Sequence, residues 1–225
     1  MQIVYFPHPA LRFKSADIRQ IDNNLRTVVR RMFELMYEAN GIGLAANQIG
    51  LPLRVFVMNL AADPEETDQE FVFINPQITN RKGSDVAEEG CLSIPKLYAD
   101  VRRPSDVQIE AFDLDGQLFE MSLDDLPARV VQHELDHLDG VMFTDKVIES
   151  QRKDVEPVLN VFEETLRQAQ AAKAYLSDDE LLNTLREIAA AGGVPGSFLE
   201  ETVAPPQADV PASLLRARKG RGEAE

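Results

Sequence analysis

The sequence predicts an α+β fold in which antiparallel β-sheets pack around a central helix, with further helices near the N-terminus and in the C-terminal part. Two observations predict the sheets. The β-rich runs come in clusters, and no helix alternates with them as a parallel sheet would require. A third observation predicts the helices: apolar residues recur at three- and four-residue steps in several longer segments, which is the spacing of one helix face.

The first helix is predicted over residues 17–39. Its apolar residues form one stripe: Ile18, Ile21, Leu25, Val28, Met32, Leu35, Met36 and Ala39. Ser15 or Asp17 can cap its start, because both side chains accept hydrogen bonds from free backbone N–H groups. Gly41 can end the helix in the left-handed conformation.

Strands are predicted from the β-rich runs that follow this helix. The runs lie at residues 53–60, 70–78, 107–114 and 117–123. The last two flank Asp115-Gly116, a pair that is typical of tight hairpin turns. The central helix, which contains the letters HELDH, then starts at Asp124 or Asp125 and ends near Leu138.

The chain divides into three parts. Residues 1–150 hold the predicted strands and the central helix. Residues 151–202 form a helical extension with helices at 154–176 and 178–191. The first of these has an apolar face that must be buried: Val155, Val158, Leu159, Phe162 and Leu166. Residues 203–225 are rich first in Pro and Ala and then in Arg, Lys, Gly and Glu, which predicts a flexible tail.

Composition excludes several classes of protein. The 225 residues are 44% hydrophobic, which is enough for a buried core and excludes a wholly disordered chain. No apolar run reaches the ~18 residues of a membrane span, and the start does not resemble a secretory signal. A single cysteine excludes an internal disulfide framework, and the net charge of −15 disfavours direct binding to nucleic acid. We therefore expect a soluble, cytoplasmic, monomeric protein.

The strongest local motif is the run HELDH at residues 133–137. Residues four apart share one face of a helix, so His133 and His137 can bind one metal ion. Leu126 and Val130 continue the same stripe, which directs both imidazoles toward the interior. The alternative is a pair of buried histidines that are hydrogen-bonded to core groups.

A hydrolytic metal site usually has three protein ligands and one open position. No histidine follows His137, and His8 lies between two prolines near the N-terminus. Cys91, in the run EEGCLSIP, is a candidate third ligand because a glycine precedes it and its neighbourhood is polar. Its alternative is a small buried apolar residue, which is the commoner state of a cytosolic cysteine.

Three runs together resemble the peptide deformylase family in sequence, order and spacing: GIGLAANQ at 41–48, EGCLS at 89–93 and HELDH at 133–137. The resemblance covers roughly residues 1–150, which would then be the catalytic domain, and includes RRP at 102–104. It implies a metal-dependent hydrolase that removes the N-formyl group from the N-terminal methionine of newly made polypeptides and releases formate.

The resemblance also implies one divalent metal ion, held by Cys91, His133 and His137. Iron(II) is common in the family. The ligand types by themselves suit zinc equally, and nickel and cobalt are further candidates.

Catalytic roles follow from the same resemblance. Glu134 would accept a proton from water and deliver it to the departing amine. The side-chain amide of Gln48 and the backbone N–H of Leu92 would donate hydrogen bonds to the tetrahedral oxyanion. Without the resemblance, Glu134 would be interpreted as an exposed helix residue, and Gln48 as a helix-end or surface residue.

Substrate contacts are expected at five positions. The backbone at Gly43 would run beside the substrate, where a side chain would obstruct it. Ile42, Leu126 and Val130 would form the apolar cavity for the methionine side chain, with plain core packing as the alternative. Arg103 resembles a family position near the substrate backbone, with a surface ion pair as its alternative.

Two residues depart from the usual pattern of the family. Arg102 stands where proline is frequent. Pro127 lies early in the central helix and fits only within its first turn, where a missing N–H costs nothing. Neither residue belongs to the expected ligands or proton carrier.

Two other functions stay open on the residues alone. An endopeptidase also uses HExxH, but it would take its third ligand from a downstream His or Glu. A structural metal module or ribosome-associated binding protein would need a fourth protein ligand for a closed site, and three candidates are evident. The expected partners are N-formylmethionyl nascent peptides, with a transient contact to the ribosome.

Overall fold

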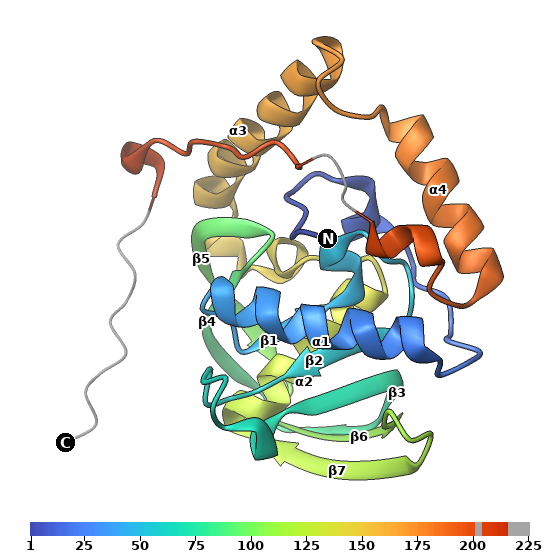
Figure 1. The fold of residues 1–225 in the computed structure, drawn as a ribbon. Helices are drawn as coiled ribbons and strands as arrows, with labels where there is room; N and C mark the ends of the chain where they lie inside the picture. Colours follow the sequence, from blue (N-terminus) through green and yellow to red (C-terminus); the bar gives the residue numbers. More distant parts are fainter. Residues whose placement is uncertain (201–203, 216–225) are drawn as a thin grey trace.

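The structure is a computed structural model that describes residues 1–200 and 204–215 (Figure 1). It contains two antiparallel sheets. The larger has the strand order β1-β2-β3-β6-β7, with bounds Gly43–Ala45, Val55–Met58, Phe71–Lys82, Asp106–Phe112 and Leu118–Asp124. The smaller pairs β4 (Asp85–Cys91) with β5 (Ile94–Arg103). The predicted α+β class with antiparallel sheets is confirmed.

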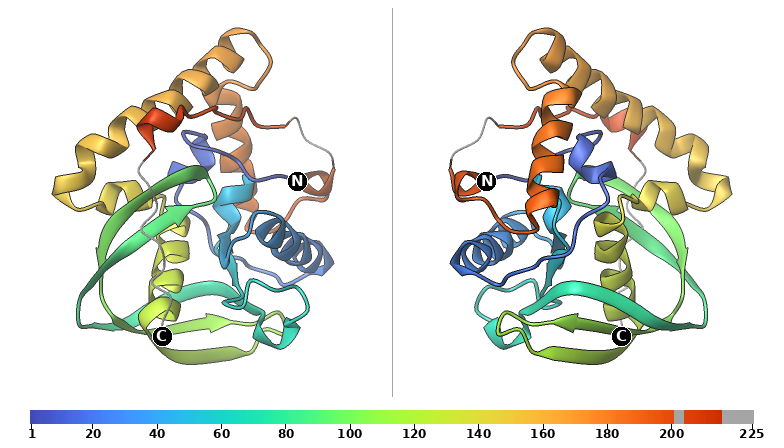
Figure 2. Two further views of the ribbon diagram at one scale, coloured as in Figure 1. Left: turned by 90° about the vertical axis from the view of Figure 1, so that its left-hand side faces the viewer. Right: turned by 90° about the vertical axis from the view of Figure 1, so that its right-hand side faces the viewer.

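The central helix, α2 (Asp125–Leu138), lies between the two sheets (Figure 2). One side of α2 packs on the larger sheet in a buried cluster that includes Ala128, Val131, Leu135 and Leu138 with Phe56, Phe73 and Ile109. The other side faces the β4–β5 hairpin, where Arg129 donates a hydrogen bond to the carbonyl oxygen of Val101 (3.0 Å). Pro127 lies in the first turn, so the predicted helix and the position of its proline are confirmed.

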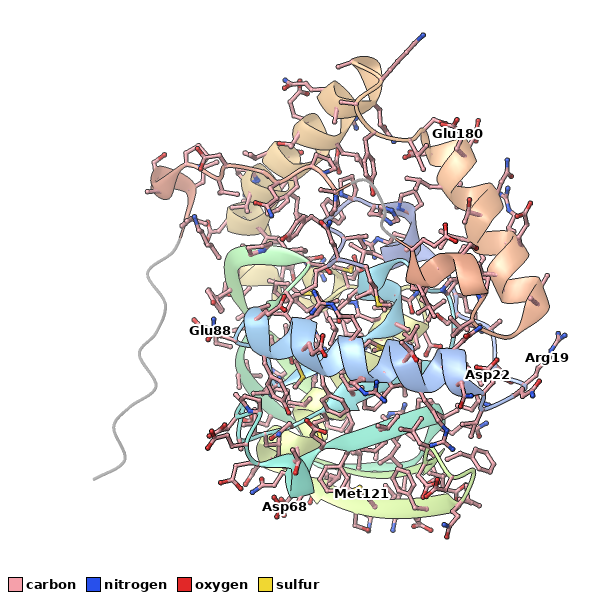
Figure 3. The ribbon with its side chains drawn as sticks, viewed as in Figure 1. Arg19, Asp22, Asp68, Glu88, Met121 and Glu180 are labelled. Atoms are coloured by element: carbon pink, nitrogen blue, oxygen red, sulfur yellow. The ribbon has the colours of Figure 1, made fainter. Side chains whose placement is uncertain are left out.

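Helix α1 spans Asn23–Glu38, so the predicted start at residue 17 was wrong. Asp22, labelled in Figure 3, caps the helix by accepting from the backbone N–H of Leu25 (2.9 Å). Further upstream, the side chain of Asn75 accepts from the N–H of Ile18 (2.8 Å) and donates to its carbonyl oxygen (2.9 Å). These two bonds satisfy the backbone groups of Ile18 without a helix. The apolar residues upstream of residue 23 are therefore part of the predicted stripe but not of helix α1.

Left-handed residues end several elements. Asn40 adopts a φ of 55° after α1, where Gly41 had been expected to do so. Asn tolerates this conformation better than most residues with a side chain. The predicted turn between β6 and β7 is confirmed, with Gly116 at a φ of 75°.

Strands β1, β4 and β5 were missing from the predicted set. β1 is only three residues long, too short for a periodic signal. β5 alternates buried and more exposed residues over much of its length, and that pattern was readable in the sequence. The pairing of β4 with β5 matters because it positions Cys91 at the hairpin tip.

Two helices follow the sheets and α2 along the chain: α3 (Arg152–Ala171) and α4 (Asp178–Ala191). The apolar face of α3 docks on the chain's own body, with Val158 and Phe162 in one buried cluster with Ile94 and Val101. α4 matches the predicted bounds. It is capped by Ser177, whose N–H donates to the carboxylate of Glu180 (2.9 Å), a residue labelled in Figure 3. Among the described helices, none has the length and apolar character to cross a membrane.

Residues 204–215 differ from the flexible tail that was predicted for residues 203–225. Val210 is only 6% exposed and belongs to the buried cluster that contains Phe162. Gln207 donates a hydrogen bond to the hydroxyl of Tyr5 (3.3 Å). Apolar side chains in the Pro/Ala-rich stretch thus find a partner surface on α3 and the N-terminal segment. The remaining positions of that tail, 203 and 216–225, lie outside the described residues.

Candidate active site

Three side chains from two elements meet beside the hairpin. His133 and His137 project from successive turns of α2, and Cys91 is the last residue of β4. The Nε2 atom of His137 lies 3.2 Å from His133 Nε2 and 3.3 Å from Cys91 Sγ. One ligand atom from each residue lies within 4.8 Å of the other two. The structure therefore brings the three predicted metal ligands together.

The spacing of these atoms suits a tetrahedral metal ion. Metal–nitrogen bonds of ~2.0–2.1 Å and metal–sulfur bonds of ~2.3 Å place neighbouring ligand atoms about 3.3–3.6 Å apart. The observed 3.2 and 3.3 Å are close to that spacing. A thiolate with two imidazoles is also a common donor set, and among the described residues no fourth side chain joins the group. The site can hold a metal ion.

Glu89 orients the first histidine. Its Oε2 lies 3.0 Å from His133 Nδ1, which leaves the Nε2 of that ring free to bind a metal. Arg103 and Arg129 donate to the same carboxylate at 2.9 and 2.7 Å. Burial disfavours the charged carboxylate, but the hydrogen bonds from His133 and Arg103 outweigh burial and hold the pKa of Glu89 well below its usual range.

The two imidazoles have opposite protonation preferences. Burial opposes the charged form of both rings. At His133, hydrogen bonds with Cys91 and Glu89 outweigh burial and raise the pKa well above 6.5. At His137, burial and the neighbouring His133 lower the pKa well below 6.5. The lowered pKa favours the neutral form of His137, which is the form of histidine that binds a metal.

Glu134 is a buried carboxylate next to these groups. It is 5% exposed, and its Oε2 has no hydrogen-bond partner among the described residues. Burial raises the pKa of Glu134 to about 7. A Cβ atom added at Gly43 would lie 2.6 Å from Glu134 Oε1, so the glycine of β1 makes room for this carboxylate. The arrangement can exchange a proton near neutral pH, and the alternative of an exposed Glu134 is excluded.

Gln48 presents its amide nitrogen to the cluster. Its Oε1 accepts from the backbone N–H of Ala45 (2.8 Å), which fixes the orientation of the amide. The NH₂ group then points at Cys91 Sγ (3.5 Å) and Ser93 Oγ (3.4 Å). Gln48 is 1% exposed, so it is not a surface residue. Leu92 lies beside it in the tight turn between Cys91 and Ile94.

A pocket of about 840 Å³ opens at this cluster. It is lined by most of the predicted site residues: Ile42, Gly43, Gln48, Cys91, Leu92, Leu126, Val130, His133 and Glu134. Leu126 is 42% exposed, so plain core packing does not describe it. Val130 lines the pocket and also belongs to the core cluster under the larger sheet, so both interpretations hold for this residue.

Arg103 is a buried residue that supports the site from beside the pocket. It is 2% exposed, which excludes a surface ion pair, and it is absent from the described residues that line the pocket. Its Nη1 donates to Asp136 Oδ2 (2.8 Å), and its other nitrogens donate to Glu89. Arg103 is buried because the register of β5 directs its side chain toward Glu89 and α2. Arg103 supports the acid that holds the histidine.

Glu89, Arg129 and Asp136 were not singled out from the sequence. For Glu89 and Arg129, their spacing from the predicted ligands could have indicated a role. Glu89 precedes Cys91 by two residues on a strand, so both face one side of the hairpin. Arg129 precedes His133 by four residues on the same helix face.

Fold and site together define a metal-dependent hydrolase, in which a buried glutamate lines one open pocket with Cys91 and His133 of the Cys/His/His cluster. The family model described as polypeptide deformylase matches residues 1–153. The chain belongs to the peptide deformylase family.

Relatives and solved structures agree with this assignment. A peptide deformylase of Rhodopirellula baltica is 47% identical over 162 residues, which are 72% of this chain and 80% of the relative. Peptide deformylase 1B of Arabidopsis thaliana, described as chloroplastic/mitochondrial, is 45% identical over 171 residues, or 73% of this chain and 62% of the relative. A crystal structure of peptide deformylase from Plasmodium falciparum has a TM-score of 0.71 at 39% identity, covering 76% of this chain and 98% of that one.

Proposed function

We propose that this chain hydrolyses the N-formyl group of formyl-methionyl peptides and releases formate, with Glu134 carrying the proton beside a metal ion held by Cys91, His133 and His137. Family membership supports the reaction. One observation supports the assignment of residues: the buried Glu134 carboxylate, with an oxygen that lacks a described partner, adjoins the Cys/His/His cluster in an open pocket.

We propose iron(II) as the ion, while zinc, nickel and cobalt also suit this donor set. A bound divalent ion would act as a Lewis acid and lower the pKa of water to about 7. Glu89 would keep the His133 ring in its ligating orientation, because it accepts from the ring nitrogen that the metal does not need.

Glu134 would accept a proton from the attacking water and then deliver it to the amine nitrogen as the amide bond breaks. Its pKa of about 7 suits both transfers, since a general base works best when its pKa is near the operating pH. Gly43 has no side chain, so the carboxylate of Glu134 can occupy the space beside it and would lie close to the reacting atoms.

Gln48 and Leu92 would stabilise the oxyanion that forms on the formyl oxygen. The Gln48 NH₂ group already faces the cluster, and its bond through Oε1 to Ala45 keeps it there. The backbone N–H of Leu92 would be the second donor. Losing one such donor typically costs about 10²–10³ in rate.

Ile42, Leu126 and Val130 would contact the methionine side chain. All three line the pocket, and Leu126 is 42% exposed. An endopeptidase is the weaker account, because the third candidate ligand is the upstream Cys91 and not a downstream His or Glu.

We further propose that residues 1–150 form the catalytic domain and that residues 151–202 stabilise it. The docked apolar face of α3 supports this division. We also propose that the enzyme acts in the cytoplasm as a monomer and meets nascent chains during a transient contact with the ribosome.

The test is formate release from formyl-Met-Ala-Ser by protein prepared anaerobically and analysed for metal. An internal peptide that lacks a formyl group should not be cleaved. Cys91→Ala should lose most of its bound metal, and full occupancy in that variant would remove Cys91 from the site.

Glu134→Gln separates the proton carrier from the metal site. The substitution keeps the shape of the side chain, so the fold and the metal content should be unchanged. Turnover should fall by about 10²–10⁴, as expected for loss of a general base. A variant that stays within about tenfold of wild type would show that another group moves the proton.

A further inference from the structure

The tip of the β4–β5 hairpin contains three residues outside the strand ladder. Cys91 pairs with Ile94 and Gly90 pairs with Tyr98, so Pro95, Lys96 and Leu97 have no partner residue on β4. Lys96 adopts a left-handed φ of 68°. This conformation is disfavoured for a residue with a side chain, and such residues cluster at functional sites.

This segment forms part of the pocket wall. Pro95, Lys96, Leu97 and Tyr98 all line the pocket that contains Cys91. Leu97 is buried and anchors the segment in the core cluster that includes Cys91 and Ile94, whereas Lys96 is exposed. Lys96 is therefore an exposed basic residue in the wall of the pocket.

Lys96 also differs from the other charged groups of the pocket. Arg129, the second basic residue of the lining, donates to Glu89 at 2.7 Å. Lys96 makes no ion pair or hydrogen bond with any residue in the described ranges 1–200 and 204–215. Glu88, Glu89 and Glu134 are the acidic residues of the lining, and Glu89 is paired with Arg103 and Arg129.

The chain path sets how far Lys96 lies from the chemistry. Ile94 pairs directly with Cys91, and Lys96 follows Ile94 by two residues. Two residues of chain span at most about 7 Å, which is also the length of two residues of an extended substrate. The long lysine side chain can thus reach the second or third residue of a peptide whose formyl-methionine occupies the cluster.

We propose that Lys96 determines specificity downstream of the methionine, by favouring peptides with an acidic side chain at the second or third residue. The inference rests on the proposed deformylation for its substrate. An exposed ion pair is weak, so the preference should be about two- to fivefold in kcat/KM and should disappear in high salt.

The test uses peptide amides, which carry no terminal carboxylate: formyl-Met-Ala-Ser-amide and its versions with Glu or Lys at the second or third position. Wild-type protein should favour the Glu peptide over the matched Lys peptide at low salt, through KM and not kcat. Lys96→Gln should lower the ratio of kcat/KM for the Glu peptide to kcat/KM for the Lys peptide to one or below, and Lys96→Glu should lower this ratio further. Turnover of the neutral peptide should stay the same in all of them.

Lys96→Gly is the control for the backbone, because glycine adopts the left-handed φ without strain. It should behave as Lys96→Gln does. If the ratio of the two kcat/KM values is unchanged in Lys96→Glu, the inference is overturned. It is also overturned if the ratio changes in Lys96→Gly but in neither Lys96→Gln nor Lys96→Glu, because the backbone would then be responsible. If the neutral peptide is not turned over, the proposed deformylation fails by itself. Calorimetric binding of the deformylated peptides Met-Glu-Ser-amide and Met-Lys-Ser-amide to the same variants then tests Lys96 independently.

Discussion

At the scale of residues, the site depends on neighbours that leave room or supply charge. Gly43 leaves room for the Glu134 carboxylate, and Glu89 supplies the charge that holds His133. His8 illustrates the opposite case, a titratable group that is buried without an ion pair to any described residue. It is 4% exposed, and its Nδ1 accepts from the N–H of Ala10 (3.1 Å). Each arrangement has a measurable consequence.

Gly43→Ala should lower kcat severely while leaving the metal content unchanged. The new Cβ would lie 2.6 Å from Glu134 Oε1, so the carboxylate must move, whereas the three ligands do not face this strand position. A displacement of this kind can cost about 10²-fold. Gly193→Ala is the matched control, because nothing lies within 4 Å of its added Cβ. Wild-type kinetics in Gly43→Ala would show that Glu134 tolerates the shift.

His8 should make the protein less stable as the pH falls. Burial lowers the pKa of His8 from 6.5 to about 4, so between these values the unfolded chain binds the extra proton. Stability is therefore complete above pH 6.5 and is lost as the pH falls toward 4. Between pH 7.5 and 5.5 the loss should be about 1.4 kcal/mol.

The measurement is urea unfolding of wild type and His8→Asn at both pH values. Asn keeps an acceptor for the N–H of Ala10 but cannot titrate. Between pH 7.5 and 5.5 the free energy of unfolding of His8→Asn should therefore fall by about 1.4 kcal/mol less than that of wild type. The difference between the two proteins removes the contributions of other groups. Equal pH dependence in both would mean that His8 is protonated in the folded state.

At the scale of elements, α2 and the β4–β5 hairpin face one another across the site, and α3 supports the hairpin from outside. Val158 and Phe162 of α3 share a buried cluster with Ile94 and Val101 of β5. The hairpin carries Cys91, one of the proposed metal ligands. Its position is therefore supported by the packing of a helix that lies outside the family's matched residues 1–153 over most of its length.

Phe162→Ala should destabilise the protein by about 3 kcal/mol or more, as is typical for a buried phenylalanine. Glu163→Ala, next to it on the outer face, should cost less than about 0.5 kcal/mol, since its ion pair with Arg167 is exposed. Denaturant unfolding measures both. If the two substitutions cost the same, α3 does not dock as the structure describes.

At the scale of the whole molecule, the N-terminal segment and residues 204–215 share one buried cluster with α3. Gln207 contacts Tyr5, and Val210 inserts into the cluster that contains Phe6 and Phe162. The C-terminal stretch thus closes a surface that the N-terminal segment and α3 share.

Truncation after Thr202 should therefore lower the melting temperature, in contrast to a flexible tail, whose loss would change nothing. Exposing the site of a buried valine costs about 2 kcal/mol, which is roughly 4–8 °C for a chain of this length. Val210→Ala in the full chain is the control and should show a part of that decrease. Truncation after Ser150 should cost more, because it also removes α3 and α4. Equal melting temperatures for the full chain and the Thr202 truncation would mean that residues 204–215 do not dock.

The sequence by itself determined the features that depend on near neighbours along the chain. The spacing of His133 and His137, the Asp115-Gly116 turn and the bounds of α4 are local patterns, and helix and hairpin geometry act over a few residues. The three family runs added Cys91, Glu134 and Gln48, which composition alone had left open between a functional and a structural role.

Tertiary structure decided whatever depends on residues far apart in the chain. Asn75 holds Ile18 outside α1, although the apolar stripe continues through it. Arg103 pairs with Glu89 and Asp136 because β5 turns it inward. The physical reason is the same in both cases. Periodicity reports which residues become buried, whereas the partner of a buried polar group is chosen by the packing of distant segments, and an unpaired group would cost too much to persist.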